Sequence, residues 1–294
     1  MPEKILFQFD TDPHASTFDA VVAIDAGVDR LVTRGGVDPT DVVGLTHGGM
    51  FTRGGDDLRH TAIFIGGSDV AAAERVRDAV TASFFGPVRV SVMMDASGCN
   101  TTAAAAVVAA CRHVEPRDAT AAVLAGTGPV GRRAAHMLAS LGCNVRLTSR
   151  RGDRADAAAR EVADGLGDRS GVGTVTGMEM ASTVDAASLT DGASIVIACG
   201  AAGVKLVEAE TLAAASGVKV AIDLNAVPPA GLGDIAATDK AAPINGSVSD
   251  AVGYGALGVG GLKMKTHKAA IGRLFRSNDA VLDADAILDI ARGV

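Results

Sequence analysis

Three glycines at fixed spacing constrain this chain more than any other feature of its sequence. Gly126, Gly128 and Gly131 form a G-x-G-x-x-G pattern. The apolar run at 121–125 is typical of a buried parallel strand, and residues 132–141 have apolar positions at helical spacing. Between a strand and a helix, this pattern predicts a dinucleotide-binding turn. In a chain with 36 glycines, the alternative is an ordinary strand-to-helix turn.

Each glycine of such a turn has a separate task. The first permits the tight turn, the second lets a pyrophosphate approach the backbone, and the third lets helix and strand pack closely. The N-terminus of the helix offers free N–H groups to the phosphates. We therefore expect the cofactor to contact the residues of this turn, namely Gly126, Thr127, Gly128, Pro129, Val130 and Gly131.

The end of the next predicted strand, 144–149, indicates which dinucleotide is bound. An acidic residue there binds the ribose 2′-hydroxyl of NAD, whereas arginine accommodates the 2′-phosphate of NADP. This chain has Ser149, Arg150 and Arg151 at that place and no acid before Asp153. Two guanidinium groups and a hydroxyl suit a phosphate dianion. The pattern predicts NADP, with NAD still possible; the alternative is a solvated basic turn.

Composition and periodicity together predict an α/β protein. Hydrophobic residues make up 48% of the 294 residues but aromatic residues only 3%, so Ala, Val, Leu and Ile must fill the core, which is usual for parallel α/β layers. Predicted strands alternate with helices along most of the chain. The strands are expected at 4–9, 30–33, 61–65, 88–94, 121–125, 144–149, 172–176, 193–198 and 219–223.

This alternation favours two domains, because an α/β layer is complete before the glycine turn begins. An N-terminal α/β catalytic domain is predicted at 1–115, with Pro116 at the joint. A Rossmann-type parallel-sheet dinucleotide-binding domain is predicted at 116–268. A glycine-rich passage at 253–261 precedes the end of the chain, whose helices within 269–294 are expected to fold back on the first domain.

Charge and residue usage exclude several classes of function. The net charge of −7 argues against a nucleic-acid partner. No apolar run reaches the roughly 18 residues that a membrane span needs, and the first residues do not resemble a signal peptide. The four cysteines have no C-x-x-C spacing and the six histidines no metal-binding pattern. We expect a cytoplasmic protein with reduced thiols and no metal.

Seven segments of the chain are similar to a known family. They are Leu6–Asp12, Phe18-Asp19, Thr61–Gly67, Asn100–Ala104, Leu124–Gly131, Asn225–Pro229 and Gly255–His267. On these segments the chain resembles the bacterial methylene-tetrahydromethanopterin and methylene-tetrahydrofolate dehydrogenases of one-carbon metabolism. The resemblance implies NADP-dependent oxidation of the methylene form to the methenyl form by hydride transfer. It also implies a homo-oligomer whose pterin substrate, tetrahydromethanopterin or tetrahydrofolate, binds between the two domains.

The resemblance also assigns roles to single residues. Phe18 is similar to the aromatic residue that packs on the pterin, and Thr102, Lys263 and His267 to the polar catalytic residues; Lys265 has no assigned role. From the residues alone, Phe18 is equally a core residue, Thr102 a helix-capping residue, Lys263 part of a solvated basic face and His267 a surface histidine. A helix would place Lys263 and His267 on one side, since they are four apart.

Three further polar residues are candidates for ligand contact. Asp10 and Asp12 follow the first strand and could bind the amino groups of a pterin, or they could simply shape the loop. Asn225 follows the strand at 219–223, at the edge where open sheets bind cofactors, and is expected near the nicotinamide.

Two other functions stay open on the sequence. One is a different NADP-dependent oxidoreductase of shikimate-dehydrogenase-like fold, although Lys4 is a poor candidate for the early lysine that it would need. The other is a non-catalytic protein that senses NADP, because fold alone does not establish catalysis.

Overall fold

The computed structural model describes residues 2–225 and 227–294, and the chain forms two compact units. The first unit combines residues up to Thr101 with Lys263–Val294, and the second is Thr102–Leu262. Both boundaries fall inside helices, α4 (Cys99–Cys111) and α9 (Ala256–Arg273), rather than at the predicted 115/116 and 268/269. Pro116 therefore lies in the loop after α4 and not at the boundary between the two units.

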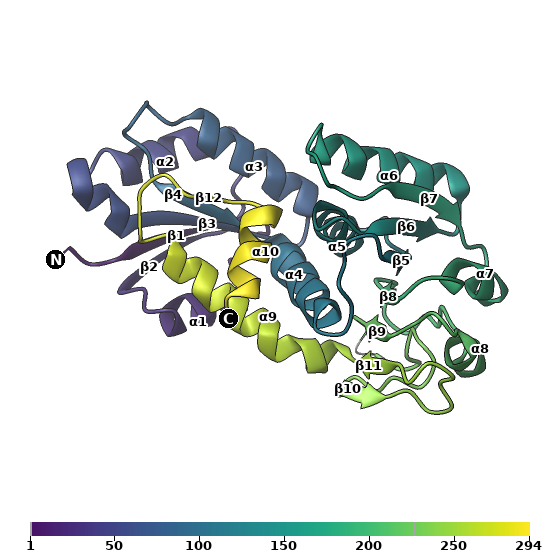
Figure 1. The fold of residues 1–294 in the computed structure, drawn as a ribbon. Coiled ribbons are helices and arrows are strands. Elements are labelled where there is room, and N and C mark those ends of the chain that lie inside the picture. The colour runs from purple at the N-terminus through teal and green to yellow at the C-terminus, as the bar shows by residue number, and fades with distance from the viewer. Residues whose placement is uncertain (1, 226) are drawn as a thin grey trace. The chain divides into compact units, whose positions relative to one another are not determined.

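The first unit contains a five-stranded sheet in the order β12-β4-β3-β1-β2, in which every pair is parallel (Figure 1). The predicted strands at 4–9, 30–33 and 61–65 are confirmed, and the fourth begins at Ser91 rather than at residue 88. The strands are β1 (Ile5–Asp10), β2 (Arg30–Arg34), β3 (Thr61–Gly66), β4 (Ser91–Met94) and β12 (Val281–Leu282).

Side-chain caps fix the start of several helices in this unit. The Ser16 hydroxyl accepts the Asp19 N–H at 3.2 Å at the start of α1, and Asp69 accepts the Ala72 N–H at 3.0 Å at the start of α3. Such caps satisfy backbone donors that the first turn leaves free. The helical segments that lie wholly in this unit are α1 (Thr17–Asp25), α2 (Val42–Met50), η1 (Gly55–His60), α3 (Val70–Ala82), η2 (Ala96–Gly98) and α10 (Ala284–Arg292).

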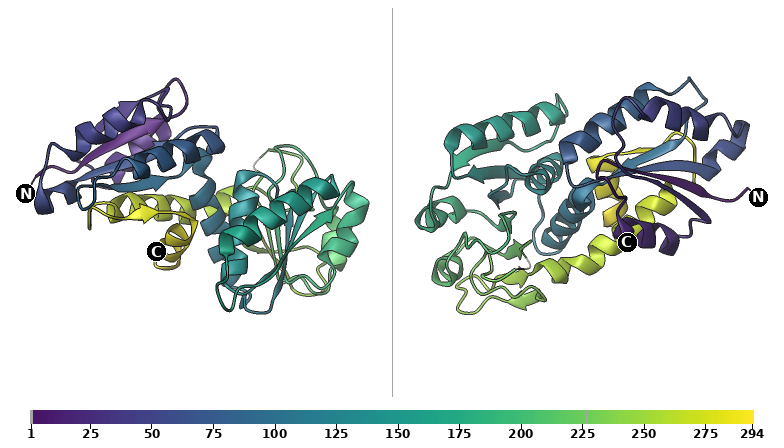
Figure 2. Two further views of the ribbon diagram at one scale, coloured as in Figure 1. Left: turned by 90° about the horizontal axis from the view of Figure 1, so that it is seen from above. Right: turned by 180° about the vertical axis from the view of Figure 1, so that it is seen from behind.

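The second unit contains a seven-stranded sheet in the order β10-β11-β9-β8-β5-β6-β7, with helices on both faces (Figure 2). Only β10 runs antiparallel to its neighbour among the described strands. The strands are β5 (Thr120–Leu124), β6 (Asn144–Ser149), β7 (Val175–Glu179), β8 (Ile195–Ala198), β9 (Val220–Asp223), β10 (Lys240–Pro243) and β11 (Val252–Tyr254). The helical segments are α5 (Pro129–Ser140), α6 (Gly152–Leu166), η3 (Thr183–Asp185), α7 (Ala186–Thr190) and α8 (Ala209–Ala214).

The order of these strands creates a switch point between β5 and β8. From β5 the chain moves outward to β6 and β7, and it then returns to β8 on the other side of β5. Open parallel sheets bind ligands at such a point, beyond the carboxyl ends of the strands. The topology therefore places the glycine turn after β5 where a dinucleotide is expected.

The glycine-rich passage at 253–261 forms the end of β11 and the start of the helix α9. One helix runs without interruption from Ala256 to Arg273. A Cβ at Gly255 would collide with the backbone of Ala236 and Ala237, and one at Gly258 with the carbonyl of Asp239. These glycines serve close packing at the start of the helix rather than turning the chain.

No helix in residues 2–225 and 227–294 is long and apolar enough to cross a membrane. The four cysteines, all within these residues, are not joined in disulfide bonds. Among the same residues, His, Cys, Asp and Glu side chains form no group that could hold a metal ion.

Candidate functional site

The glycine turn after β5 has the packing that its sequence predicts. A Cβ at Gly126 would lie 2.8 Å from Val123 Cγ1, and one at Gly131 would collide with the backbone of Gly126. At Gly128, which caps α5, an added Cβ would meet nothing within 4 Å. Two glycines thus pack the turn tightly, and the third leaves its outer side open to a ligand.

The start of α5 is suited to bind an anion. Pro129 occupies the first helical position, and the turn before it has Ala125 in the left-handed region at φ 50°. The turn is held to β6, since Ala125 N–H donates to Thr148 Oγ1 at 3.0 Å and Gly126 N–H to the Thr148 carbonyl at 2.9 Å. Free N–H groups of the first turn, which includes Val130, face outward from a rigid support.

A cavity of about 470 Å³ lies beside this turn, wholly within the second unit. Its walls come from the ends of the three strands that meet at the switch point. They are Ala125 and Thr127 after β5, Ser149 at the end of β6, Arg150, Arg151 and Arg154 after it, and Gly200, Ala201, Val204 and Leu206 after β8. The structure therefore brings Thr127 together with the three predicted residues at the end of β6.

The arginines of this cavity are not equivalent. Arg151 binds Asp153 through Nε at 2.9 Å and Nη2 at 2.5 Å, and this exposed pair lowers the pKa of Asp153 below its usual value. Arg150 and Arg154 are exposed and have no ion pair with any described residue. Two guanidinium groups are therefore available to a phosphate without first breaking a bond.

Asn225 is held in the loop after β9. Its N–H donates to the buried carboxylate of Asp223 at 2.9 Å, its Nδ2 donates to the Pro229 carbonyl at 3.2 Å, and its Oδ1 accepts the Val227 N–H at 2.9 Å. Asp223 also accepts the N–H groups of Gly231 and Leu232. These bonds shape the loop, and the contact of Asn225 with nicotinamide stays a prediction. Ala226 of this predicted segment lies outside the described residues.

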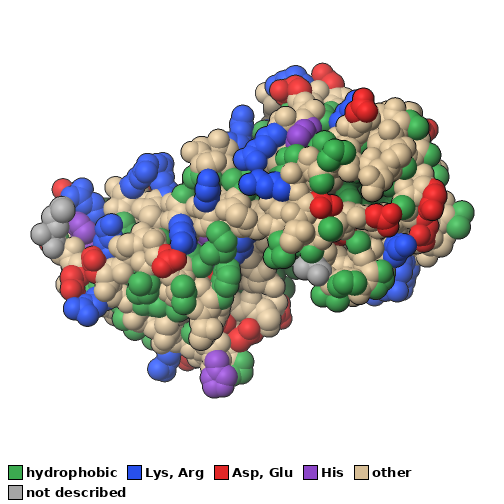
Figure 3. All heavy atoms as spheres, turned by 90° about the horizontal axis from the view of Figure 1, so that it is seen from below, with side chains coloured by type: hydrophobic (Ala, Val, Ile, Leu, Met, Phe, Trp, Pro, Cys, Tyr) green, Lys and Arg blue, Asp and Glu red, His purple; other side chains and the backbone are tan. Residues whose placement is uncertain are grey.

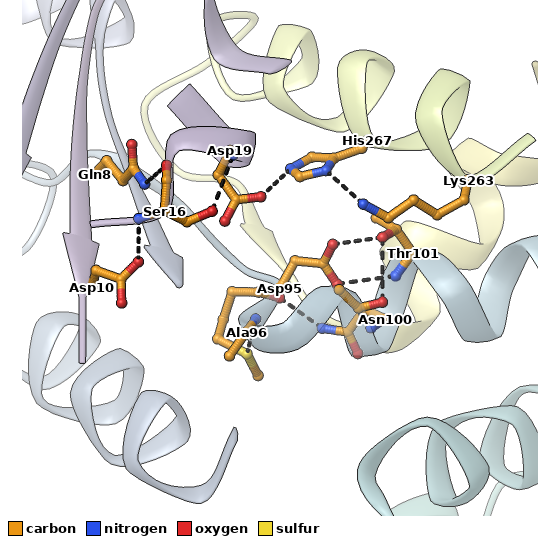
Figure 4. Close-up of polar contacts among 12 residues, drawn as sticks. Gln8, Asp10, Ser16, Asp19, Asp95, Ala96, Asn100, Thr101, Lys263 and His267 are labelled. Atoms are coloured by element: carbon orange, nitrogen blue, oxygen red, sulfur yellow. Dashed lines mark hydrogen bonds and ion pairs between the residues drawn. The ribbon is translucent and has the colours of Figure 1, made fainter. Parts of the chain in front are cut away.

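In the first unit, Lys263 is the centre of a second cluster (Figure 4). Its Nζ lies 3.3 Å from His267 Nδ1 and 4.5 Å from the centre of the Phe18 ring. Burial lowers the pKa of Lys263, and the charges of Asp95 and Asp19 oppose that shift. The predicted pairing of Lys263 and His267 on one side of a helix is confirmed.

His267 is fully buried, so its interpretation as a surface histidine is wrong. Its ring stacks on Phe64 with 5.5 Å between centres, and burial followed by the charge of Lys263 lowers its pKa to about 3. A charged ammonium can only donate, so Nδ1 accepts and the hydrogen lies on Nε2. Figure 4 shows that Nε2 points toward Asp19, whose Oδ1 is 4.0 Å away, beyond hydrogen-bond length.

Asp95 connects this cluster to the start of α4. Its carboxylate accepts the N–H groups of Asn100 at 2.8 Å and Thr101 at 3.0 Å, and the Thr101 hydroxyl at 2.6 Å. Burial raises the pKa of Asp95 to about 6, against the effect of these bonds. Asp95 therefore caps the start of α4, and Asn100 and Thr101 donate the hydrogen bonds.

The other predicted substrate residues have distinct surroundings. Phe18 is 52% exposed, so it is not a core residue. Thr102 is half-buried on α4 and is the first residue of the second unit. Asp10 accepts the N–H groups of Asp12 and Ser16, and Asp12 accepts the N–H and hydroxyl of Ser68. These hydrogen bonds support the interpretation that Asp10 and Asp12 shape the loop.

Comparison with known proteins decides the family. A sequence profile described as methylene-tetrahydromethanopterin dehydrogenase, N-terminal, matches residues 17–97. The bifunctional protein MdtA of Methylorubrum extorquens is 44% identical over 294 residues, which cover 99% of both chains. The NAD(P)-dependent methylenetetrahydromethanopterin dehydrogenase of the same organism is 35% identical over 90% of both chains.

The chain belongs to the methylene-tetrahydromethanopterin dehydrogenase family. The resemblance inferred from seven short segments is thereby confirmed along the whole chain.

Two solved structures of other proteins resemble this family member in fold alone. A shikimate 5-dehydrogenase from Listeria monocytogenes has a TM-score of 0.54 at 11% identity, covering 98% of this chain and 96% of that one. The 5-ketofructose reductase of a Gluconobacter strain has a TM-score of 0.53 at 15% identity, covering 99% of both chains. The predicted α/β class with a Rossmann-type parallel sheet is confirmed.

Sequence reasoning missed three polar residues that this family member places at its candidate sites. Asp19 and Asp95 act on Lys263, and Arg154 lines the cavity of the second unit. Arg154 could have been found, since it lies only four residues after Arg150, in the first turn of α6. Nothing in the sequence joins Asp95 to Lys263, because they come together only when β4 and α9 pack in one unit.

Proposed function

We propose that this chain is an NADP-dependent methylene-tetrahydromethanopterin dehydrogenase, which oxidises the methylene form of its carrier to the methenyl form by direct hydride transfer. The observation that carries the proposal is the 44% identity to MdtA across 99% of both chains. Methylene-tetrahydrofolate is the second carrier that we propose to test. We also propose that the protein acts as a homo-oligomer.

NADP fits the residues of the second unit. The open outer side of Gly128 and the N-terminus of α5 would hold the pyrophosphate, and Arg150, Arg154 and Ser149 would hold the 2′-phosphate. When bound, NADP accepts the hydride at its nicotinamide ring. The chain contributes position, since reacting atoms must be held about 3–3.5 Å apart for rapid transfer.

The residues of the first unit suit a step that creates positive charge. The carbon that loses the hydride lies between two nitrogens, whose lone pairs delocalise the charge, so the step needs no obligatory base. Around Lys263 two carboxylates, Asp19 and Asp95, face one ammonium group, and His267 is neutral. When both acids are ionised the surplus of negative charge favours a developing cation. Phe18 offers its exposed ring as a platform for the flat pterin.

One spectrophotometric assay tests this function. The purified protein is incubated with methylene-tetrahydromethanopterin or methylene-tetrahydrofolate, each with NADP or NAD, and the absorbance of reduced nicotinamide is followed. We expect the fastest reduction with NADP and methylene-tetrahydromethanopterin. No reduction in any of the four mixtures would contradict the proposal.

A further inference from the structure

Three acids lie in the segment from the end of β1 to the first turn of α1, and two of them are already bound by the protein. Asp10 accepts the N–H groups of Asp12 and Ser16 at 2.9 and 3.0 Å. Asp12 accepts the Ser68 N–H at 3.0 Å and the Ser68 hydroxyl at 2.8 Å. These carboxylates hold the loop in shape, so a ligand would have to compete with bonds that the fold uses.

Asp19 has a different environment. Its side chain is 15% exposed, and the exposed Phe18 ring precedes it in the first turn of α1. Its Oδ1 lies 4.0 Å from His267 Nε2, a distance that leaves the contact short of a hydrogen bond. The Asp19 carboxylate also faces Gly66 at the end of β3. A Cβ at Gly66 would lie 3.5 Å from Asp19 Oδ2, and a longer side chain there would extend toward the carboxylate. The Asp19 carboxylate has the Ser16 hydroxyl as a hydrogen-bond partner, and the exposure of its side chain leaves further acceptor capacity on an accessible side.

The pterin ring has a matching set of donors. Its aminopyrimidinone edge carries the ring N3–H and the 2-amino group, which point the same way and can form two parallel hydrogen bonds to one carboxylate, as a guanidinium does. The flat ring can also pack on an aromatic side chain such as Phe18. A carboxylate beside an exposed aromatic ring is therefore a suitable receptor for this edge.

On the basis of the proposed function, we propose that Asp19, rather than Asp10 or Asp12, accepts the two N–H donors of the pterin edge while Phe18 supports the ring. Asp19 is then a substrate-binding residue that recognises the 2-amino group. The Ser16 hydroxyl is a hydrogen-bond partner of this carboxylate, and His267 Nε2 lies 4.0 Å from it.

The charges around Asp19 give this role a pH dependence. Burial raises the pKa of Asp19, and Asp10 adds to the rise, whereas the Ser16 hydroxyl and Lys263 lower it. His267 faces the same carboxylate but is neutral. The ionised acid is the acceptor, so pterin binding should weaken as the pH falls through the raised pKa of Asp19.

The test compares tetrahydrofolate with its 2-desamino analogue, which lacks the amino group, in calorimetric titrations of the NADP-loaded protein. We expect the wild-type protein to bind tetrahydrofolate at least tenfold more tightly than the analogue. In Asp19→Asn this preference should shrink to less than threefold while the Kd of NADP is unchanged. Asp25→Asn is the matched control, because Asp25 lies on the same helix and pairs with Lys268 at the surface.

The outcomes separate this assignment from the function on which it rests. Equal binding of the two pterins by the wild-type protein, or an intact preference in Asp19→Asn, would overturn the role of Asp19 and leave the dehydrogenase activity untouched. A wild-type protein that binds neither pterin and reduces no NADP would overturn both. The comparison of the two pterins in the wild-type protein can be made even if Asp19→Asn is unstable.

Discussion

The cofactor turn of the second unit is made of backbone, whereas the Lys263 cluster of the first unit is made of side chains. The turn requires residues without a Cβ at Gly126, Gly128 and Gly131, because a Cβ would fill or distort it. Lys263 acts through partners on α1, α9 and the loop after β4. A backbone site depends on local geometry, and a side-chain site depends on how distant segments pack.

The two regions also differ in how they treat charge. The arginines beside the cofactor turn are exposed, so water screens them and they can adjust to a phosphate. The charges around Lys263 are largely withdrawn from water, and each shifts the pKa of its neighbours. On α1, which contributes Phe18 and Asp19 to this cluster, Phe18, Val21 and Ile24 are exposed. Hydrophobic side chains gather in patches on the face of the molecule drawn in Figure 3.

The largest effect of a substitution is expected at Gly131, where the packed turn leaves no space for a side chain. In Gly131→Val the side chain would collide with the backbone of Gly126, so we expect the second unit to lose about 3 kcal/mol of stability or more. NADP binding should be lost with it. Gly128→Ala is the control, because its Cβ meets nothing within 4 Å; its unfolding should shift by less than about 1 kcal/mol. Calorimetric unfolding and NADP titration measure both, and a Gly131→Val protein as stable as wild type would refute the packing argument.

The next largest effect tests the side-chain site. The charge of Lys263 lowers the pKa of Asp19 and of Asp95, so Lys263→Met should favour the protonated acids, which no longer stabilise a developing cation. It also removes the contacts with Phe18 and His267. We expect kcat/KM for the methylene carrier to fall about 100-fold, which corresponds to about 3 kcal/mol. The Kd of NADP should not change. Lys265→Met on the same helix, where the side chain is exposed, should keep nearly wild-type rates. Similar losses in both variants would remove the special role of Lys263.

A smaller effect is expected from the exposed arginines. Arg150→Ala and Arg154→Ala should each raise the Kd of NADP about tenfold and leave that of NAD unchanged, because only NADP carries the 2′-phosphate. Arg151→Ala should have a smaller effect, since Arg151 is paired with Asp153. Fluorescence titration with both dinucleotides checks this, and equal losses for NADP and NAD would contradict the 2′-phosphate assignment.

The smallest effect is a pH dependence of stability with two opposing parts. The pKa of His267 falls from 6.5 to about 3 on folding, so the unfolded chain binds the extra proton and the free energy of unfolding decreases as the pH falls below about 6.5. The pKa of Asp95 rises from 3.8 to about 6, so the folded chain binds the extra proton and stability increases as the pH falls from about 6 to 4. At about 1.4 kcal/mol per pKa unit each part alone is a few kcal/mol, and because the two parts oppose each other the net change between pH 7 and 4 is on the order of 1 kcal/mol.

Urea unfolding between pH 4 and 7 separates the two parts. His267→Gln should flatten the loss of stability at low pH, and Asp95→Asn should steepen it, because the opposing gain is removed. The amide oxygen that Asp95→Asn introduces can still accept the N–H groups of Asn100 and Thr101, so the start of α4 is preserved. Parallel pH profiles for both variants and the wild type would contradict these shifts.

The sequence by itself determined the α/β class, the glycine turn and the arginines after β6. Each of these depends on neighbouring residues, because strands, helices and tight turns impose their requirements within a few positions. Helical spacing likewise paired Lys263 with His267. Even the burial of the Ala-rich helix α4 follows from its uniform apolar sequence.

Only the tertiary structure decided which acids surround Lys263 and that His267 is buried. Asp19, Asp95 and His267 are far apart in the chain and meet through the packing of α1, α9 and the loop after β4. Asp10 and Asp12 look equally suited to a ligand in sequence, but the fold uses their oxygens for its own N–H groups. Burial and hydrogen-bond satisfaction are properties of the packed chain, so no local pattern could reveal them.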